Sequence, residues 1–306
     1  MIAFKDIEIS DKEAITKHTM TSDRRNCDLS FSNLCSWRFL YNTQYAIVDN
    51  FLVLRFWRDG ELAYMMPVGN GNLKETIKLL ILDARAQGQP FRMLGVCKGM
   101  QADLENILPD KFVYTTTRDL ADYIYLRTDL ATLKGKKFQS KRNFTNRFKR
   151  ANPNYEYAPI TPQNIDECLI LEEKWCKTND CDEFEDTDNE RKALTFALKN
   201  FEAIGLTGGL LRLDGEIIAF TYGMPINHDT FGVHVEKADT EIEGAYAMIN
   251  MEFANRIPEE YTYINREEDL GVPGLRKAKL SYNPAILLEK SMVNLLQDEP
   301  VELINW

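Results

Sequence analysis

Two Asp-Gly dipeptides, Asp59-Gly60 and Asp214-Gly215, each separate two runs of alternating or apolar residues in this chain of 306 residues. Each dipeptide predicts a tight β-hairpin, because glycine accepts the positive φ that such a turn needs. In both halves the predicted order is helix, helix, hairpin, strand, helix, strand, helix and strand, and the last predicted strand covers residues 285–293. We infer an internal duplication of fold without a detectable residue-level repeat.

The length of the chain suits two domains of ordinary size, each with its own core. The predicted division is an N-terminal domain at 1–130, a basic connecting helix at 131–150 and a C-terminal domain at 151–306. Hydrophobic residues make up 44% of the chain and charged residues 27%, which is typical of soluble globular proteins. The first residues show no signal-peptide pattern, and no window approaches a membrane span. These features predict a cytoplasmic protein without a transmembrane segment.

Positive charge is concentrated in residues 133–150, LKGKKFQSKRNFTNRFKR, although the formal net charge of the chain is −10. Phe138, Phe144 and Phe148 recur at helical spacing, which predicts an amphipathic helix with a buried aromatic face. The other face is left for water or for an anion. The candidate phosphate-binding or substrate-binding residues are Lys136, Lys137, Lys141 and Arg142. A sequence pI near 5.0 argues against duplex DNA as a partner.

Cysteine and histidine are too few and too scattered to predict a metal site. The six cysteines form no CxxC pair, and the chain has only His18, His228 and His234. We therefore expect no metal and interpret the cysteines as reduced, mostly buried thiols.

The predicted order of elements is that of the GNAT acyltransferase fold. In particular, strand 230–236 and the helix that opens at Gly244-Ala245-Tyr246 resemble the GNAT segment that receives the pyrophosphate of coenzyme A. The first amides of a helix lack intrahelical acceptors and lie at the positive end of its dipole, so they can hold a phosphate. Gly244 would let the anion approach the backbone. The loop lacks the usual basic-Gly-x-Gly spacing, so an ordinary helix start is the alternative.

Two motifs together, LKGKKFQSKRNFTNRF and NREEDLGVPGLRKAKLSYNP, resemble the soluble bacterial relatives of the phosphatidylglycerol lysyltransferase C-terminal domain. This family has tandem GNAT-like domains and is allied to the Fem peptidyltransferases. The resemblance covers essentially the whole chain and implies an α+β fold, with a mixed, mainly antiparallel sheet flanked by helices in each half. It also implies transfer of an acyl or aminoacyl group to an amine or hydroxyl, but not a lipid acceptor.

The resemblance gives roles to residues near the end of the chain. Asn265 would hold the pantetheine arm of the donor, and Arg276, Lys277 and Lys279 would pair with its phosphates. Tyr282 would protonate the leaving thiolate. The alternatives are a turn former for Asn265, surface solubility for the three cations and a buried core tyrosine.

The end of strand 230–236 supplies candidates for the chemistry itself. Glu236 could accept a proton from the attacking group, and His234, on the same face of the strand, is a second possible base. Backbone amides from Val235 to Lys237 are candidates for stabilising an oxyanion. A solvated glutamate and a half-buried histidine are the alternatives. No GxSxG or Cys-His pattern appears, which favours direct attack on the bound donor.

Three functions remain open from the sequence. The first is a GNAT-type acyltransferase with acyl-CoA as donor and a small-molecule acceptor bound between the two halves. The second is an aminoacyl transferase that takes aminoacyl-tRNA as donor. The third is a binding module that keeps the fold without catalysis.

Overall fold

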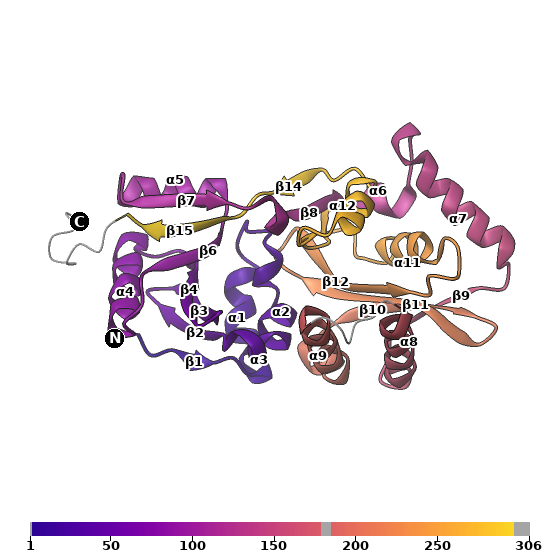
Figure 1. Ribbon diagram of the computed structural model, residues 1–306, viewed down its shortest axis with the longest axis horizontal. Helices are drawn as coiled ribbons and strands as arrows, with labels where there is room; N and C mark the ends of the chain where they lie inside the picture. The colour runs from indigo at the N-terminus through magenta and orange to yellow at the C-terminus, as the bar shows by residue number, and fades with distance from the viewer. Residues whose placement is uncertain (1, 179–184, 297–306) are drawn as a thin grey trace.

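The computed structural model describes residues 2–178 and 185–296 and contains two mixed β-sheets flanked by helices. Figure 1 shows the two sheets side by side along the long axis of the molecule, with helices packed on their faces. The predicted α+β class with one mixed, mainly antiparallel sheet in each half is therefore confirmed.

The first sheet is built mainly by the first half of the chain. Its strands, in spatial order, are β1 (Lys5–Asp6), β2 (Gln44–Val48), β3 (Phe51–Arg58), β4 (Glu61–Met65), β6 (Arg92–Val96), β15 (Ser291–Leu295) and β7 (Phe112–Thr116). The short β5 (Val68–Gly69) pairs with β3. Only the pairing of β4 with β6 is parallel among the described strands of this sheet.

The second sheet repeats the arrangement of the first. Its strands, in spatial order, are β14 (Ile286–Leu288), β8 (Asp122–Leu126), β13 (Tyr263–Asn265), β12 (Thr230–Ala238), β11 (Glu216–Pro225), β10 (Thr207–Leu213) and β9 (Glu156–Pro159). Here the parallel pair is β12 with β13, at the position that β4 and β6 occupy in the first sheet. The two copies thus share the GNAT-like strand order.

The two copies exchange one strand with each other. β8, which precedes residue 130, lies between β13 and β14 of the second sheet, and β15 lies between β6 and β7 of the first. Each of the predicted segments 1–130 and 151–306 therefore supplies one strand to the sheet of the other. The predicted single strand at 285–293 is wrong for the same reason, because it contains β14 and the start of β15, which belong to different sheets.

Both Asp-Gly dipeptides form the predicted hairpin turns. Asp59 and Gly60 join β3 to β4 with φ of 54° and 80°, and Asp214 and Gly215 join β10 to β11 with φ of 52° and 89°. Positive φ at both central residues is typical of the turn whose twist matches that of the flanking strands.

Helices cover the faces of both sheets. They are α1 (Lys12–Thr19), α2 (Phe31–Ser36), α3 (Arg38–Tyr41), α4 (Leu73–Ala86), α5 (Lys98–Ile107), α6 (Arg127–Thr132), α7 (Gln139–Ala151), α8 (Ile165–Thr178), α9 (Glu185–Lys199), α10 (Phe201–Ile204), α11 (Ala245–Ala254) and α12 (Pro273–Leu280), with 3₁₀ turns η1 (Ile9–Asp11), η2 (Cys27–Leu29), η3 (Arg118–Leu120) and η4 (Lys136–Phe138). Within the described residues, every helix is too short or too polar to cross a bilayer.

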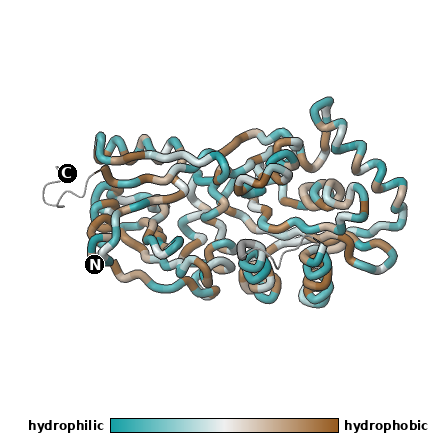
Figure 2. The backbone as a smooth tube through the Cα atoms, viewed as in Figure 1, coloured by the Kyte–Doolittle hydropathy of each residue, from teal (hydrophilic) through white to brown (hydrophobic). Residues whose placement is uncertain are grey.

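The basic stretch forms η4 and α7, as predicted. Phe138 of η4 and Phe148 of α7 are buried, whereas Phe144 is half-buried and lines the cavity described below. Hydrophilic residues predominate along the rest of α7 in Figure 2. α7 packs against α11, so the aromatic face fixes the basic helix beside the second sheet.

The hydrophobic core does not divide cleanly between the halves. One buried cluster contains Leu34 and Cys35 of α2 together with Leu194 and Leu198 of α9. Apolar side chains from both halves are thus buried against each other, which holds the two sheets in one unit. The five described cysteines are buried and unpaired, and Cys181 lies outside the described residues.

Candidate functional site

A cavity of about 1500 Å³ lies where β12 and β13 separate. The two strands are parallel and pair only from 230–232 to 263–265, and the residues that follow, 233–237 and 266–268, line the cavity. Asn33 and Trp37 from the first half line it too. The predicted location of the site, at the end of the central strand and between the halves, therefore coincides with a cavity.

Glu236 lines this cavity as one partner of a partly buried ion pair. Arg266 Nη2 donates to Glu236 Oε1 at 2.9 Å, and Asn250 Nδ2 donates to Oε2 at 3.1 Å. Both carboxylate oxygens are therefore engaged. A role for Glu236 as proton acceptor stays a prediction. In the structure its carboxylate neutralises the charge of Arg266.

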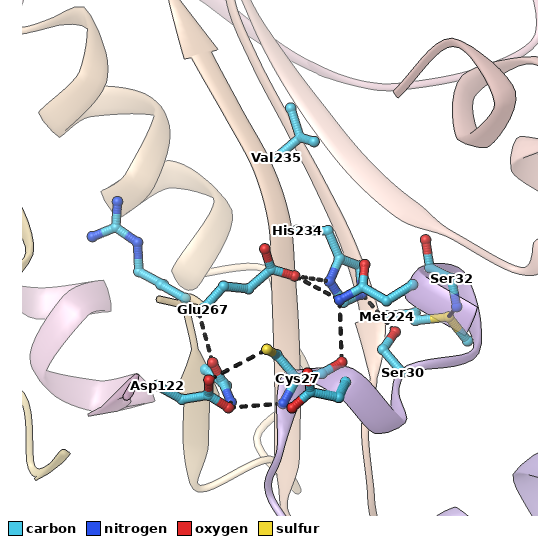
Figure 3. Close-up of polar contacts among 12 residues, drawn as sticks. Cys27, Ser30, Ser32, Asp122, Met224, His234, Val235 and Glu267 are labelled. Carbon is cyan, nitrogen blue, oxygen red and sulfur yellow. Dashed lines mark hydrogen bonds and ion pairs between the residues drawn. The ribbon is translucent and has the colours of Figure 1, made fainter. Parts of the chain in front are cut away.

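His234 links the two halves at the wall of the cavity (Figure 3). Its Nε2 lies 2.7 Å from Ser30 Oγ, and its Nδ1 lies 2.8 Å from Glu267 Oε1. Burial acts to raise the pKa of Glu267, but hydrogen bonds with His234 and Asn33 bring it below the ordinary value. Since both ring nitrogens are occupied, His234 can exchange a proton with a substrate only through one of these partners.

Val235 and Lys237 lie on the stretch of β12 that has separated from β13, and both line the cavity. The Lys237 ammonium lies 2.9 Å from Glu190 Oε1 and 3.4 Å from the ring centre of Trp175. Glu172 is a second, buried carboxylate near this lysine, at 3.9 Å, and burial raises its pKa to about 7. The end of β12 is thus lined by closely spaced groups of both charges.

The start of α11 borders the cavity through Gly244 and Tyr246, whereas Ala245 is buried. Gly244 has φ of +86°, and a Cβ there would lie 2.8 Å from the carbonyl oxygen of Phe144 on α7. The glycine is therefore needed for the approach of α7. Tyr246 accepts a hydrogen bond from Trp175 Nε1 at 2.8 Å.

The four cations expected from the basic stretch differ in position. Lys136 is exposed, Lys137 pairs with Asp129 at 2.8 Å, and Arg142 donates to backbone carbonyls before the helix. Lys141 alone of the four lines the cavity. A role for these four cations in binding a phosphate or substrate stays a prediction, and of the four only Lys141 is at the cavity.

Tyr282 is buried, and its ring is contacted by two of the cations of the cavity. Lys141 Nζ lies 4.1 Å from the ring centre and Arg266 Cζ lies 5.0 Å from it. Burial raises the pKa of Tyr282 above its ordinary value, so the phenol keeps its proton near neutral pH.

Asn265 is structural in this fold. It is fully buried, and its Nδ2 donates to the carbonyl oxygen of Arg25 at 2.7 Å and to Asp122 Oδ2 at 2.8 Å. Its side chain joins β13 to the first half and to β8, and it is not among the residues that line the cavity.

The cations of α12 are engaged within the protein or exposed. Arg276 pairs with Asp269 at 2.7 Å and with Asp119 at 2.6 Å, and Lys277 is exposed. Lys279 lines the cavity, but its ammonium donates to backbone carbonyls, including that of Arg266 at 2.6 Å. The expected grouping of Arg276, Lys277 and Lys279 around a phosphate is therefore not present.

Sequence reasoning missed Arg266, Glu267, Glu190 and Ser30. Arg266 and Glu267 follow Asn265 directly, and a run of charged residues immediately after a buried strand was a usable signal. Glu190 and Ser30 come from distant segments, and only the packing of α2 and α9 brings them to the second sheet.

Comparison with known proteins agrees with the duplicated architecture. A crystal structure of a conserved protein of unknown function from Bacteroides thetaiotaomicron has 67% identity and a TM-score of 0.95, covering 96% of this chain and 100% of that one. The C-terminal domain of a putative lysylphosphatidylglycerol synthetase from Agrobacterium fabrum has 13% identity and a TM-score of 0.68, covering 93% and 91%. L-PGS from Bacillus licheniformis has 15% identity and a TM-score of 0.67, covering 99% and 98%.

No curated protein sequence matches the chain significantly. The family model described as "Phosphatidylglycerol lysyltransferase, C-terminal" matches residues 19–294, which include the basic helix, β12 and the cavity-lining segment after β13. The chain therefore belongs to the family of phosphatidylglycerol lysyltransferase C-terminal domains.

Proposed function

We propose that this protein is an aminoacyltransferase, which moves an amino acid from the 3′ end of an aminoacyl-tRNA to a hydroxyl or amine of a second substrate. The family description names lysyl transfer, and the fold is the GNAT-like one. The observation that carries the proposal is the mixed charge of the cavity.

Groups of both signs line this cavity. Cations are provided by Lys141 and Arg266, and carboxylates by Glu190, Glu236 and Glu267. An aminoacyl ester on RNA has matching features, since the amino acid bears an ammonium and the RNA bears phosphodiesters. A carboxylate of the cavity can bind the ammonium of the amino acid, and a guanidinium or lysine ammonium can bind a phosphodiester.

Exposed cations in and before α7 suit an RNA donor. α7, which brings Lys141 to the cavity, also carries the exposed Lys149 and Arg150, and the exposed Lys134 and Lys136 precede it. Exposed cations of this kind would contact phosphates without reading sequence.

Direct transfer needs one new bond and two proton movements. The hydroxyl or amine of the acceptor attacks the ester carbonyl carbon, and a carboxylate accepts its proton. The bond between this carbon and the ribose oxygen then breaks, and the carboxylic acid returns the proton to the leaving oxygen. We infer that Glu236 or Glu267, which both line the cavity, accepts that proton directly or through water.

Retention of tRNA on a filter tests the donor. For at least one amino acid, the protein should retain the aminoacyl-tRNA more tightly than the same tRNA after deacylation. Retention should weaken steeply as the salt concentration rises. Glu190→Gln should reduce the preference for charged tRNA, whereas Glu202→Gln, at an exposed position, should not. Equal retention of charged and deacylated tRNA would contradict the proposal.

The transfer itself is tested with radiolabelled aminoacyl-tRNA and fractions of bacterial amines, sugars and lipids. The label should move to a product in at least one fraction, and the fraction identifies the acceptor class. A protein that binds charged tRNA but transfers nothing would instead be a binding module.

A second candidate is an acyltransferase that uses acyl-CoA. One observation favours it. α11 is the next element after β12, and Gly244, the residue before its first turn, borders the cavity, where a helix N-terminus can hold a phosphate. Calorimetry with coenzyme A decides this. Saturable binding together with thiol release from acetyl-CoA would support it, and no heat at millimolar ligand would dispose of it.

A further inference from the structure

We propose that Arg266 and Lys141 form a subsite for one phosphodiester group. That this phosphodiester belongs to a substrate of aminoacyl transfer rests on the function proposed above. The subsite itself follows from the contacts of these two side chains and of Tyr282.

Arg266 has an unused donor. Its Nη2 pairs with Glu236, but its Nη1 is buried and has no hydrogen-bond partner within the described residues. The side chain is only 12% exposed. A buried N–H of a charged group is costly without an acceptor, so this nitrogen points to a ligand that supplies one.

Lys141 is the second cation of the subsite. It is half-buried and lines the cavity, and within residues 2–178 and 185–296 it has no carboxylate partner. Its ammonium lies over the ring of Tyr282, the ring that Arg266 also contacts. Burial and the positive charge of Arg266 lower the pKa of Lys141, and the opposing effect of the Glu236 carboxylate is smaller, which agrees with two cations that share one carboxylate.

The charge balance selects the ligand class. Arg266 and Lys141 contribute two positive charges, and Glu236 cancels one, which leaves a single positive charge in a partly buried place. A phosphodiester carries one negative charge and two free oxygens that suit a guanidinium and an ammonium. A pyrophosphate would bring a surplus of negative charge close to Glu236.

Two sources of a phosphodiester fit this chemistry. One is the last internucleotide linkage of a tRNA, for which the dinucleotide cytidylyl-(3′→5′)-adenosine is the probe. The other is the headgroup of a glycerophospholipid, for which glycerophosphoglycerol is the probe. Calorimetry with each probe on the full chain separates the two sources, and pyrophosphate and acetate serve as anions of other classes.

Charge variants test the subsite directly. Lys141→Met keeps the apolar stem and should weaken binding of the preferred probe about tenfold or more. Lys17→Met, at an exposed position on α1 outside the cavity and the basic stretch, should leave binding unchanged. Glu236→Gln removes the internal counter-charge and should strengthen phosphodiester binding and permit pyrophosphate to bind. Circular dichroism and the urea midpoint establish that each variant is folded.

The outcomes separate this inference from the proposed function. Phosphodiester binding that depends on Lys141 supports the subsite even if no aminoacyl group is transferred. If transfer occurs but binding of both probes is the same in Lys141→Met as in the unaltered protein, the subsite is wrong while the transferase stands. Failure of both probes to bind, or tighter binding of acetate than of either, also overturns it.

Discussion

Ser30 Oγ lies 2.7 Å from His234 Nε2, although 204 positions separate the two residues. Ser30 precedes α2 in the first half, and His234 lies on β12 in the second sheet. Together with Glu267, they form a chain of hydrogen bonds that crosses between the halves at the cavity wall. This chain makes the cavity a product of both halves.

Ser30→Ala should destabilise the protein by about 1–3 kcal/mol, because it leaves a buried nitrogen of His234 without its partner. Ser30 makes no side-chain capping bond to α2, so the helix start should not add to this loss. Urea unfolding measures the effect, with the exposed Ser281→Ala as the control. A loss as small as that of the control would mean that the contact does not hold the halves together.

Glu172 should make the stability of the protein depend on pH. Burial raises its pKa from 4.5 to about 7 on folding, so between these values the folded state holds a proton that the unfolded chain has released. The stabilisation is complete below pH 4.5 and is lost as the pH rises towards 7, by about 3 kcal/mol in total. Glu172→Gln has no titrating group at this position, so its stability should not fall in this way between pH 4.5 and 7.

The measurement is the free energy of unfolding of both proteins from pH 4.5 to 8. Glu173→Gln is the matched control, because Glu173 is exposed on the same helix and its pKa is lowered by Lys177, so it titrates below this window. A constant difference between the unaltered protein and Glu172→Gln across the window would refute a protonated Glu172.

Gly244→Ala should destabilise the protein by about 2 kcal/mol, since φ there is +86° and the new Cβ would meet the backbone of α7. Gly274→Ala is the control. Gly274 lies within α12 with open space around it, so alanine there should be neutral or stabilising by up to about 1 kcal/mol. The temperature of thermal unfolding should therefore fall for Gly244→Ala and should rise or stay unchanged for Gly274→Ala. Equal shifts would show that α7 does not pack tightly on this glycine.

Much of the fold was predictable from local pattern. The Asp-Gly turns, the aromatic spacing of Phe138 and Phe148 and the order of helices and strands are set by residues near one another in sequence. The strand exchange was not predictable, because alternation identifies a strand but not the sheet that it joins. The break at Glu289-Lys290, which separates β14 from β15, is short and polar and resembles any surface turn.

The location of the cavity was predictable from the sequence, but the residues that line it were less so. Glu236, His234, Lys141 and Tyr282 do line the cavity, as expected from the end of the central strand and from the resemblance. Arg276 does not, because Asp269 and Asp119 are close enough to hold it, and a sequence does not reveal which cations already have partners. Free cations such as Lys141 could be told from paired ones only in three dimensions.

The exchanged strands also bear on how the protein is made. Thr116 of β7 is hydrogen-bonded to Ser291 of β15, 175 positions later. A ribosome that has finished β7 must therefore add the whole second half before the gap between β6 and β7 can be filled. Until then the nascent first sheet has two unpaired inner edges, so the two halves are expected to reach their native state together, only after β15 has been made.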